Sequence, residues 1–407
     1  MKKILLLGGS AQQVVAIEKA KEMGFYTVLC DYLADNPGQY VADKFYLTST
    51  TDKDAVLAVA MAEQIDGVLA YASDPAAPTA AYVATKMGLP SNPLVSVETL
   101  CNKDAFREFL RKNGFHTPVA RGYQLREEAV SDVVRKIQEE KDLFCLPVIV
   151  KPVDSSGSKG VTVLHDWDGL TEAIDFAFSF SRGKRIIVEE FIEKKHPYLI
   201  GGDLFVCDGK VVLWGLLNCH RDSSVNPLVP VGKSYPLELS KEDEDRVKAT
   251  LQQLVDGLQI RHGAMNVELI VDKNNRVWPI DVGPRNGGNM IPDLLGLIFG
   301  VDVVEMSIQA AMGLKVDVQL QEQSACYATH NIHTDQNGTY VDVEFSQEVE
   351  AFVLKKCLYK KAGDPVEYFD NAAKALGIVF LKFEDEKQMQ SILAEINQHI
   401  KVVVAQG

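Results

Sequence analysis

The sequence lacks long apolar runs and paired cysteines. No stretch reaches the roughly 20 apolar residues that a membrane-spanning helix needs. The apolar start at residues 4–7 is too short for a signal peptide, and Gly8 and Gly9 follow it at once, so we interpret it as a first strand. The seven cysteines form no CxxC pair, which is typical of free thiols in a reducing compartment. We therefore expect a cytoplasmic protein without a membrane segment.

Positive charge is also scarce. Lys and Arg number 42 against 56 Asp and Glu, and the net charge is −14. A general nucleic-acid binder or a protein that binds anionic membranes needs a basic surface, so we expect neither class of partner. A local basic pocket for a nucleotide stays open. The 407 residues are 46% hydrophobic, which allows two to four domains with an ample core.

Two common site patterns are missing. The residues after Gly8 read Gly-Ser-Ala-Gln-Gln and do not form the GxGxxG pattern, so we expect no nicotinamide site. The sequence also presents no candidate Ser/His/Asp triad. The glycine turn still follows a strand, where open α/β sheets bind ligands. A carboxylate-bearing substrate near Gly9, Ser10 and Asp74 is the resulting hypothesis.

The first 95 residues alternate between predicted strands and predicted helices. This alternation predicts a doubly wound parallel sheet. We expect strands at 3–7, 26–31 and 67–71, and helices at 11–23, from Thr51 to 64, and at 75–87.

A loop of small residues follows the apolar run 146–150, which we interpret as a buried strand that leads into Lys151. Such a loop can bring backbone N–H groups close to an anion, and its hydroxyls and ammonium add donors. An ordinary turn between two strands is an equal alternative. The loop consists of Ser155, Ser156, Gly157, Ser158, Lys159 and Gly160.

Other charged residues stand in unusual places. Lys103 lies in the first turn of a helix capped by Asn102, where the helix dipole disfavours a cation, so it is either solvated or held for an anion. Glu189 and Glu190 end an apolar strand and need solvent or a ligand there. Arg221, in a predicted loop at 218–222, is a candidate to bind a carboxylate, with a solvated loop as the equal alternative.

A predicted hairpin at 265–282 carries one acid on each strand. Glu268 and Asp281 flank its turn, so antiparallel pairing would bring them together. Two carboxylates from neighbouring strands suit Mg²⁺, and a pair of exposed acids is the alternative. A helix at 291–312 follows, and the remainder forms a predicted α+β lobe that ends in a helix at 386–400.

Several of these motifs, taken in order, resemble the ATP-grasp superfamily. The resemblance is to its carboxylate–amine ligase branch, which is carbamoyl-phosphate-synthetase-like and phosphoribosylglycinamide-synthetase-like. It implies a doubly wound pre-ATP-grasp domain, a two-lobed ATP-grasp domain and a small C-terminal lobe. The motifs are Gly8-Gly9-Ser10, Asn102-Lys103-Asp104, Lys151-Pro152, the Ser155 to Val161 loop, Glu189-Glu190-Phe191-Ile192, Glu268 and Asp281-Val282-Gly283-Pro284-Arg285. The implied domains are the N-terminal domain at 1–95, a linker helix region at 96–125, a small lobe with the phosphate lid at 126–192, a large lobe with the metal site at 193–318 and a C-terminal α+β lobe at 319–407.

The resemblance also implies roles for the site residues. Lys103 and Lys151 would contact ATP, and the lid from Ser155 to Gly160 would close over its β- and γ-phosphates. Arg285 and Lys159 would be catalytic, with Arg285 neutralising the transferred phosphate. The hinge that reads the adenine edge would be Glu189, Glu190, Phe191 and Ile192. The ligands of Mg²⁺ or Mn²⁺ would be Glu268 and Asp281.

Two departures from the family pattern concern the ribose and the metal. In the family, a carboxylate that binds the ribose follows the hinge at a fixed spacing, which in this chain falls on His196 or Pro197. We therefore assign the ribose carboxylate to Asp203 and infer a short insertion before it. Relatives commonly have Glu-x-Asn where this chain has Asp281-Val282-Gly283. The Asn ligand is missing, so Asp281 and phosphates would hold the second Mg²⁺.

The expected activity is that of an ATP- and Mg-dependent ligase. It would activate a small-molecule carboxylate as an acyl phosphate for attack by an amine, which forms a C–N bond. The alternatives are a phosphoribosylglycinamide-synthetase-like or carbamoyl-phosphate-type ligase and a catalytically degenerate ATP-binding protein. A homodimer is an expectation from the resemblance alone.

Overall fold

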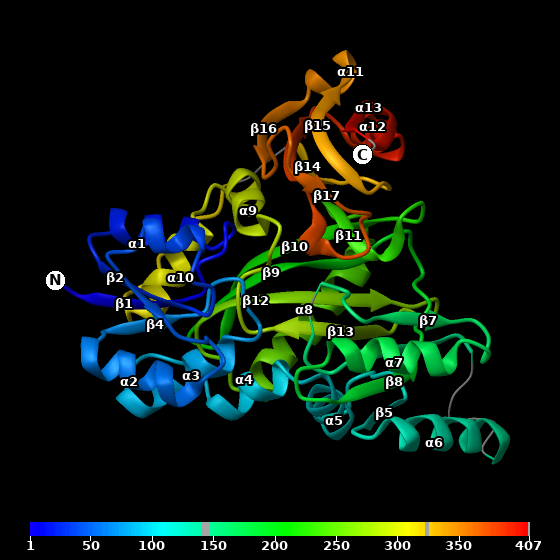
Figure 1. Ribbon diagram of the computed structural model, residues 1–407, viewed down its shortest axis with the longest axis horizontal. Helices are drawn as coiled ribbons and strands as arrows, with labels where there is room; N and C mark the ends of the chain where they lie inside the picture. The colour runs from blue at the N-terminus through cyan, green and yellow to red at the C-terminus, as the bar shows by residue number, and fades with distance from the viewer. Residues whose placement is uncertain (140–145, 156, 322–324, 406–407) are drawn as a thin grey trace.

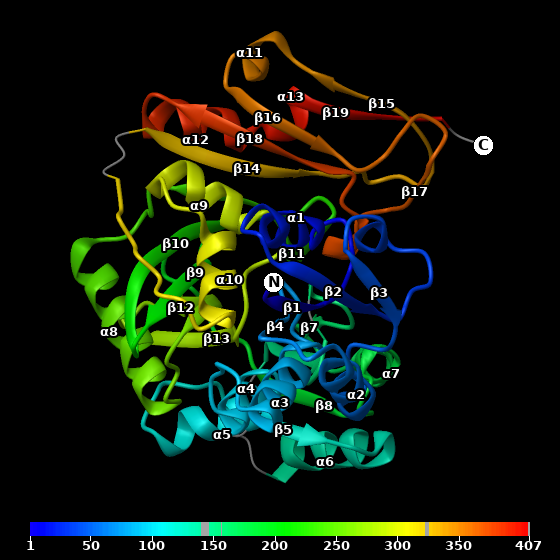
Figure 2. The ribbon, with the colours of Figure 1, turned by 90° about the vertical axis from the view of Figure 1, so that its left-hand side faces the viewer.

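The computed structural model describes residues 1–139, 146–155, 157–321 and 325–405. Within these residues the chain forms four sheets (Figures 1 and 2). The N-terminal sheet is parallel, in the order β3-β2-β1-β4, with α1 on one face and α2 and α3 on the other, which confirms the doubly wound prediction. Its strands are β1 (Lys3–Leu7), β2 (Tyr26–Asp31), β3 (Lys44–Leu47) and β4 (Gly67–Leu69). The helices of this part are α1 (Val14–Glu22), η1 (Pro37–Tyr40), α2 (Lys53–Glu63), α3 (Ala77–Met87) and α4 (Leu94–Leu100).

A four-stranded antiparallel sheet forms the next part, in the order β5-β8-β6-β7. Helices α6 and α7 contact each other, and their apolar side chains share a core with this sheet. The cluster includes Val133, Ile174 and Val188. The elements are α5 (Lys103–Lys112), β5 (Ala120–Tyr123), α6 (Arg126–Glu139), β6 (Val148–Pro152), β7 (Thr162–Leu164), α7 (Leu170–Phe180) and β8 (Ile186–Glu190).

The largest sheet has eight strands in the order β13-β12-β9-β10-β11-β14-β18-β16. It crosses the boundary that we placed between residues 318 and 319, because β14, β18 and β16 extend the sheet that β9 to β13 begin. Its strands are β9 (Leu199–Cys207), β10 (Lys210–Asp222), β11 (Asn226–Tyr235), β12 (Gly263–Val271), β13 (Val277–Gly283), β14 (Cys326–Ile332), β16 (Val353–Leu358) and β18 (Gly377–Phe383). Its helices are α8 (Lys241–Gly257), α9 (Ile291–Phe299) and α10 (Val303–Ala311).

A small sheet in the order β17-β15-β19 completes the C-terminal part, seen at the top of Figure 2. Its elements are β15 (Gly338–Phe345), α11 (Gln347–Glu350), β17 (Pro365–Val366), η2 (Ala372–Lys374), α12 (Glu386–Ala394), α13 (Ile396–His399) and β19 (Ile400–Ala405).

Four local predictions need correction. The helix expected at 291–312 is broken at Gly300, whose φ of 68° is left-handed and ends α9. The loop expected at 218–222 is the end of β10, which pairs with strands on both sides. The cap of α2 is Asp52 rather than Thr51, because the Asp52 carboxylate accepts from the Ala55 N–H. The final helix gives way to β19 at Ile400.

In the part of the chain that the structure describes, no single helix is long and apolar enough to cross a membrane. Helices α9 and α10 are long and apolar enough only when they are taken together, and the chain bends by 112° between them.

Candidate active site

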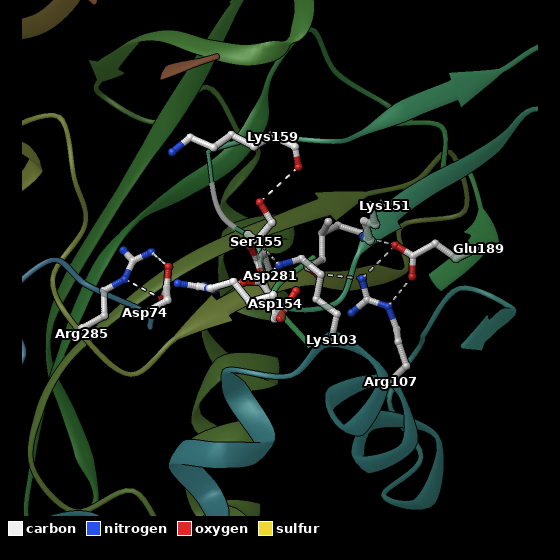
Figure 3. Close-up of polar contacts among 12 residues, drawn as sticks. Asp74, Lys103, Arg107, Lys151, Asp154, Ser155, Lys159, Glu189, Asp281 and Arg285 are labelled. Carbon is white, nitrogen blue, oxygen red and sulfur yellow. Dashed lines mark hydrogen bonds and ion pairs between the residues drawn. The ribbon is translucent and has the colours of Figure 1, made fainter. Parts of the chain in front are cut away.

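The charged residues singled out in the sequence gather where α5, β6, β8 and the β12–β13 hairpin meet (Figure 3). Glu189, at the end of β8, is only 2% exposed and lies at one side of this group. The Arg107 guanidinium donates from Nε to Glu189 Oε2 at 2.8 Å, and the Lys151 ammonium pairs with the same carboxylate. The three residues join α5, β6 and β8.

The electrostatics of this cluster follow from its burial. Burial alone would raise the pKa of Glu189, but the charges of Arg107 and Lys151 hold it at about 2. Burial also lowers the pKa of Lys151, although Glu189 opposes the shift. The predicted need of Glu189 for solvent or a ligand is therefore met by these two cations. Sequence reasoning missed Arg107, although it lies four residues after Lys103 and so on the same face of α5.

Lys103 connects the loop after β6 to the hairpin. The predicted cap is confirmed, because the Asn102 side chain accepts from the Ala105 N–H at the start of α5. The Lys103 ammonium then donates to the Ser155 carbonyl at 2.9 Å and lies 3.6 Å from Asp281 Oδ1. A cation at this helix start thus has one carboxylate and one carbonyl beside it.

The backbone of the small-residue loop is left-handed at three residues. Gly157, Ser158 and Gly160 have φ angles of 67°, 62° and 74°, all in the left-handed region. Backbone of this kind can point N–H groups toward an anion. Ser158 Oγ donates to the Leu228 carbonyl of β11 at 2.8 Å, so the loop contacts the large sheet. Ser156 lies outside the described residues.

The other lid residues have distinct positions. Ser155 Oγ donates to the Lys159 carbonyl at 3.1 Å, while the Lys159 side chain extends away from Lys151 and Glu189 (Figure 3). Asp154, which sequence reasoning missed, fixes the base of the loop. Its carboxylate accepts from Ser181 Oγ at 2.9 Å and from the Gly183 N–H at 2.6 Å.

The two acids of the hairpin face each other. Glu268 pairs with Asp281 in the antiparallel register of β12 and β13, as the position of the turn predicts. The Glu268 carboxylate pairs with the Arg221 guanidinium. Burial would raise the pKa of Glu268, but Arg221 and then Lys233 hold it below its usual range. Asp281 is less enclosed, with its side chain 45% exposed.

This donor set fits a divalent cation that also takes ligands from elsewhere. Residues 1–139, 146–155, 157–321 and 325–405 contain no group of three or more His, Cys, Asp or Glu placed to hold a metal. Two facing carboxylates are nevertheless what Mg²⁺ uses when phosphate oxygens complete its shell. In the described part of the chain, Arg221 Nε and Arg107 Nη1 are buried without a hydrogen-bond partner, which suits an anionic ligand nearby.

Arg285, just after β13, is held by Asp74 from the turn between β4 and α3. Arg285 Nε donates to Asp74 Oδ1 at 2.7 Å, and Nη2 pairs with Oδ2. Arg285 Nη1 donates to the Asn286 carbonyl at 3.0 Å. Burial would raise the pKa of Asp74, but Arg285 keeps it below the usual value, so both groups carry charge at neutral pH.

One expected ligand contact is not supported by the geometry, and two of the predicted hinge residues also make contacts within the protein. The Asp203 carboxylate is fully buried in β9 and accepts from the Gly287 N–H and from Asn266 Nδ2, so it holds the loop after β13 instead of facing a ribose. The N–H of Phe191 in the predicted hinge donates to the Pro147 carbonyl at 3.2 Å. Glu190 Oε2 accepts from the Val119 N–H at 3.3 Å.

The glycine turn after β1 likewise has no spare donors for a substrate carboxylate. The Gly9 N–H donates to Asp31 Oδ2 at 2.7 Å. The Ser10 N–H and Oγ both donate to Gln13 Oε1, at 3.0 and 2.9 Å. These donors stabilise the turn itself.

A cavity of about 130 Å³ lies between the N-terminal sheet, α9 and β16, with Gly287 of the loop after β13 in its wall. Its wall is largely apolar and includes one carboxylate, Asp293, whose pKa is raised by burial. The lining residues are Ala11, Gln12, Val15, Tyr71, Ala72, Gly287, Met290, Asp293, Cys357 and Tyr359.

Comparison with known proteins agrees with the motifs. The family model described as ATP-grasp domain matches residues 144–293. Over 360 residues the chain is 31% identical to the formate-dependent phosphoribosylglycinamide formyltransferase of Synechococcus sp. (strain WH7803), with 85% of each chain covered. It is 24% identical to the C-terminal section of the carbamoyl phosphate synthase large chain of Aquifex aeolicus (strain VF5), over 77% of this chain and 58% of that one.

Two other curated relatives are longer, and the matched region spans 58% and 35% of their length. Two further formate-dependent phosphoribosylglycinamide formyltransferases match over 47% of this chain and 48% of their own length. Among solved structures, the L-amino acid ligase from Bacillus licheniformis superposes with a TM-score of 0.78 at 18% identity, covering 100% of this chain and 99% of that one. At this identity the likeness shows the fold alone. The motifs and the 31% identity together establish that the chain is a member of the ATP-grasp superfamily, in its carboxylate–amine ligase and carbamoyl-phosphate-synthetase-like branch.

Proposed function

We propose that the protein is an ATP-dependent ligase that activates a small-molecule carboxylate as an acyl phosphate and joins it to an amine. The observation that carries the proposal is the pairing of Glu268 with Asp281 in a group that also holds three cations. Those cations are Lys103 and Arg221, which contact the two acids, and Arg285, which follows β13. Phosphoryl transfer needs positioning and charge neutralisation of this kind more than a protein nucleophile.

ATP would lie between the small-lobe sheet and the hairpin. Lys103 and Lys151 would contact it, with the Ser155 to Gly160 lid over the β- and γ-phosphates. The lid's left-handed backbone and the unpartnered N–H groups of Arg107 and Arg221 support this placement, because a polyphosphate offers many acceptors. Ile192 and its neighbours after β8 would border the adenine.

Glu268 and Asp281 would hold the divalent cation, Mg²⁺ or Mn²⁺, which neutralises charge on the phosphates when bound. In the structure each acid faces a protein cation, Arg221 for Glu268 and Lys103 for Asp281. We expect ATP to draw these cations toward its phosphates and so free the carboxylates.

The reaction would proceed in two displacements. A carboxylate oxygen of the substrate attacks the γ-phosphorus, the bond to the β-phosphate oxygen breaks, and ADP leaves. The amine nitrogen then attacks the acyl carbon, phosphate departs with the C–O bonding electrons, and the nitrogen loses a proton. Arg285 and Lys159 would neutralise the transferred phosphoryl group.

The cavity that Gly287 and Asp293 line would take the amine substrate. Its volume of about 130 Å³ suits a small group. The Asp293 carboxylate in its wall, which lies 3.7 Å from Lys355 Nζ, would pair with an ammonium. Ala11, Val15 and Met290 would contact an apolar substituent.

The test is ADP release from the purified protein with ATP and Mg²⁺, followed by mass spectrometry of products. Substrates would be amino-acid pairs, formate with phosphoribosylglycinamide, bicarbonate with ammonia, and glycine with phosphoribosylamine. We expect release that requires a carboxylate and a divalent cation, and its loss in Asp281→Asn. The exposed Asp342 of β15 supplies the matched control, Asp342→Asn. ATP binding without turnover on any pair would instead favour a degenerate ATP-binding protein.

A further inference from the structure

Gly283 ends β13 next to Arg285, and its missing side chain leaves space that another residue fills. A Cβ atom placed on Gly283 would lie 2.5 Å from Asp74 Oδ1 and 3.2 Å from Arg285 Nε. The φ of Gly283 is outside the left-handed region, so its backbone conformation does not require glycine. The space around it requires glycine only as long as the Asp74 side chain keeps its position, because real Cβ atoms essentially never approach other heavy atoms so closely.

The group in that space comes from a distant part of the chain. Asp74 lies between β4 and α3 of the N-terminal sheet, 211 residues from Arg285 in sequence. It faces Arg285 with both carboxylate oxygens, as Figure 3 shows. A two-point contact between a carboxylate and a guanidinium fixes the orientation of the guanidinium as well as its position.

The contact leaves part of the guanidinium free to act. Arg285 uses Nε and Nη2 for Asp74 and one hydrogen of Nη1 for the Asn286 carbonyl. One hydrogen on Nη1 and one on Nη2 remain for a ligand, since a guanidinium has five N–H groups. The side chains of Asp74 and Arg285 are 24% and 14% exposed, so the pair is screened from water on most sides.

We propose that Asp74 is a positioning residue for Arg285, and that its carboxylate takes the place of the side chain that Gly283 lacks. The inference rests on the proposed function of Arg285 at the transferred phosphate. The N-terminal part of the chain then completes the reaction centre. It also follows that position 283 cannot carry a side chain while the Asp74 carboxylate keeps its place.

This exclusion predicts a compensating pair of substitutions. Gly283→Asn alone should displace Asp74 and disturb Arg285, so kcat should fall at least tenfold and Tm should drop. Asp74→Ala alone should lower kcat by a similar factor. In the double variant Asp74→Ala/Gly283→Asn the crowding is gone, so we expect Tm to recover and kcat to be no lower than in either single variant.

Two further variants separate positioning from folding. Asp74→Asn keeps an acceptor for Arg285 Nε, so it should retain more kcat than Asp74→Ala, with the dissociation constant for ATP unchanged within twofold in both. Gly169→Ala is the glycine control, because Gly169 has an ordinary φ of −88° and its nearest neighbour is 3.5 Å from the added Cβ. It should leave Tm and kcat near the wild-type values.

The outcomes distinguish this inference from the proposed function. If the decrease in Tm of the double variant equals the sum of the decreases in the two single variants, the steric exclusion is wrong. Additive kcat losses, or Asp74→Ala with wild-type kcat, would overturn the positioning role. If the wild-type protein releases no ADP with any substrate pair, the proposed function fails and the positioning role with it, while the Tm series still tests the exclusion.

Discussion

Arg107 and Glu189 form a buried ion pair that joins α5 to β8, with both side chains 2% exposed and Nε 2.8 Å from Oε2. Arg107 Nη2 also donates to the Ile280 carbonyl of β13 at 2.7 Å, so one guanidinium ties the small-lobe sheet to the hairpin that carries Asp281. The pair therefore sets the distance between the two sides of the candidate ATP site.

Removal of Arg107 should destabilise the fold strongly. Arg107→Met leaves Glu189 with Lys151 as its one cationic partner in the dry interior, and breaking a buried pair costs about 3–5 kcal/mol. Urea unfolding measures the loss. Arg111→Met on the same helix is the control, because Arg111 is 61% exposed and should change stability by less than about 1 kcal/mol. Equal effects of the two variants would contradict a buried pair.

The stability of the protein should also depend on the charge of Glu189 in acid. Its pKa is about 2 in the folded protein against 4.5 ordinarily, so the stabilisation is complete above pH 4.5 and is lost as the pH falls toward 2. The free energy of unfolding should therefore fall more steeply between pH 5 and 3 in wild type than in Glu189→Gln, by at most about 3 kcal/mol. Parallel curves from denaturant titrations would show that Glu189 is not held ionised.

The two hairpin acids should differ in their effect on stability. Glu268→Gln and Asp281→Asn should each abolish Mg²⁺-dependent ADP release. Glu268→Gln should also lower Tm, because it leaves the Arg221 guanidinium, whose side chain is 16% exposed, without its carboxylate. Asp281 is 45% exposed and 3.6 Å from Lys103, so Asp281→Asn should unfold near the wild-type temperature. Full activity in either variant would contradict the metal assignment.

Crowding at the base of the lid gives a fourth prediction. A Cβ at Gly160 would lie 2.9 Å from both Phe180 Cβ and Pro152 Cγ, and its φ is left-handed. Gly160→Ala should therefore shift the lid and raise KM for ATP about tenfold, or about 1.4 kcal/mol. Gly157→Ala has the same φ penalty but meets its nearest atom at 3.7 Å, so its KM should rise less. Equal increases would mean that backbone strain alone is responsible.

The sequence was most informative where contacts are local or follow from a turn. Strand β2 matches its predicted bounds because alternating strands and helices leave little freedom, and Glu268 meets Asp281 because both flank one hairpin turn. The Arg107–Glu189 and Asp74–Arg285 pairs could not be predicted in this way. Their partners are 82 and 211 residues apart and meet only when separate elements pack together.

Asp203 shows that the position of a residue in the sequence does not fix the direction of its side chain. Its sequence position suggested a ligand contact, but side-chain direction on a strand depends on register, and the register of β9 with β12 turns this carboxylate toward Asn266 and the Gly287 N–H. The glycine at position 283 stood out in the sequence as a departure from the family pattern. The residue that fills its space could not be predicted, because Asp74 is far away in the chain.

The strand order of the eight-stranded sheet restricts how the protein can be shortened. β14 pairs with β11, so a chain cut after residue 318 would leave the backbone of β11 at an open edge. Such edges pair readily with other chains. A fragment that retains every candidate ATP-binding residue should therefore aggregate rather than behave as an independent domain, and attempts to transplant this site need to carry β14, β18 and β16 with it.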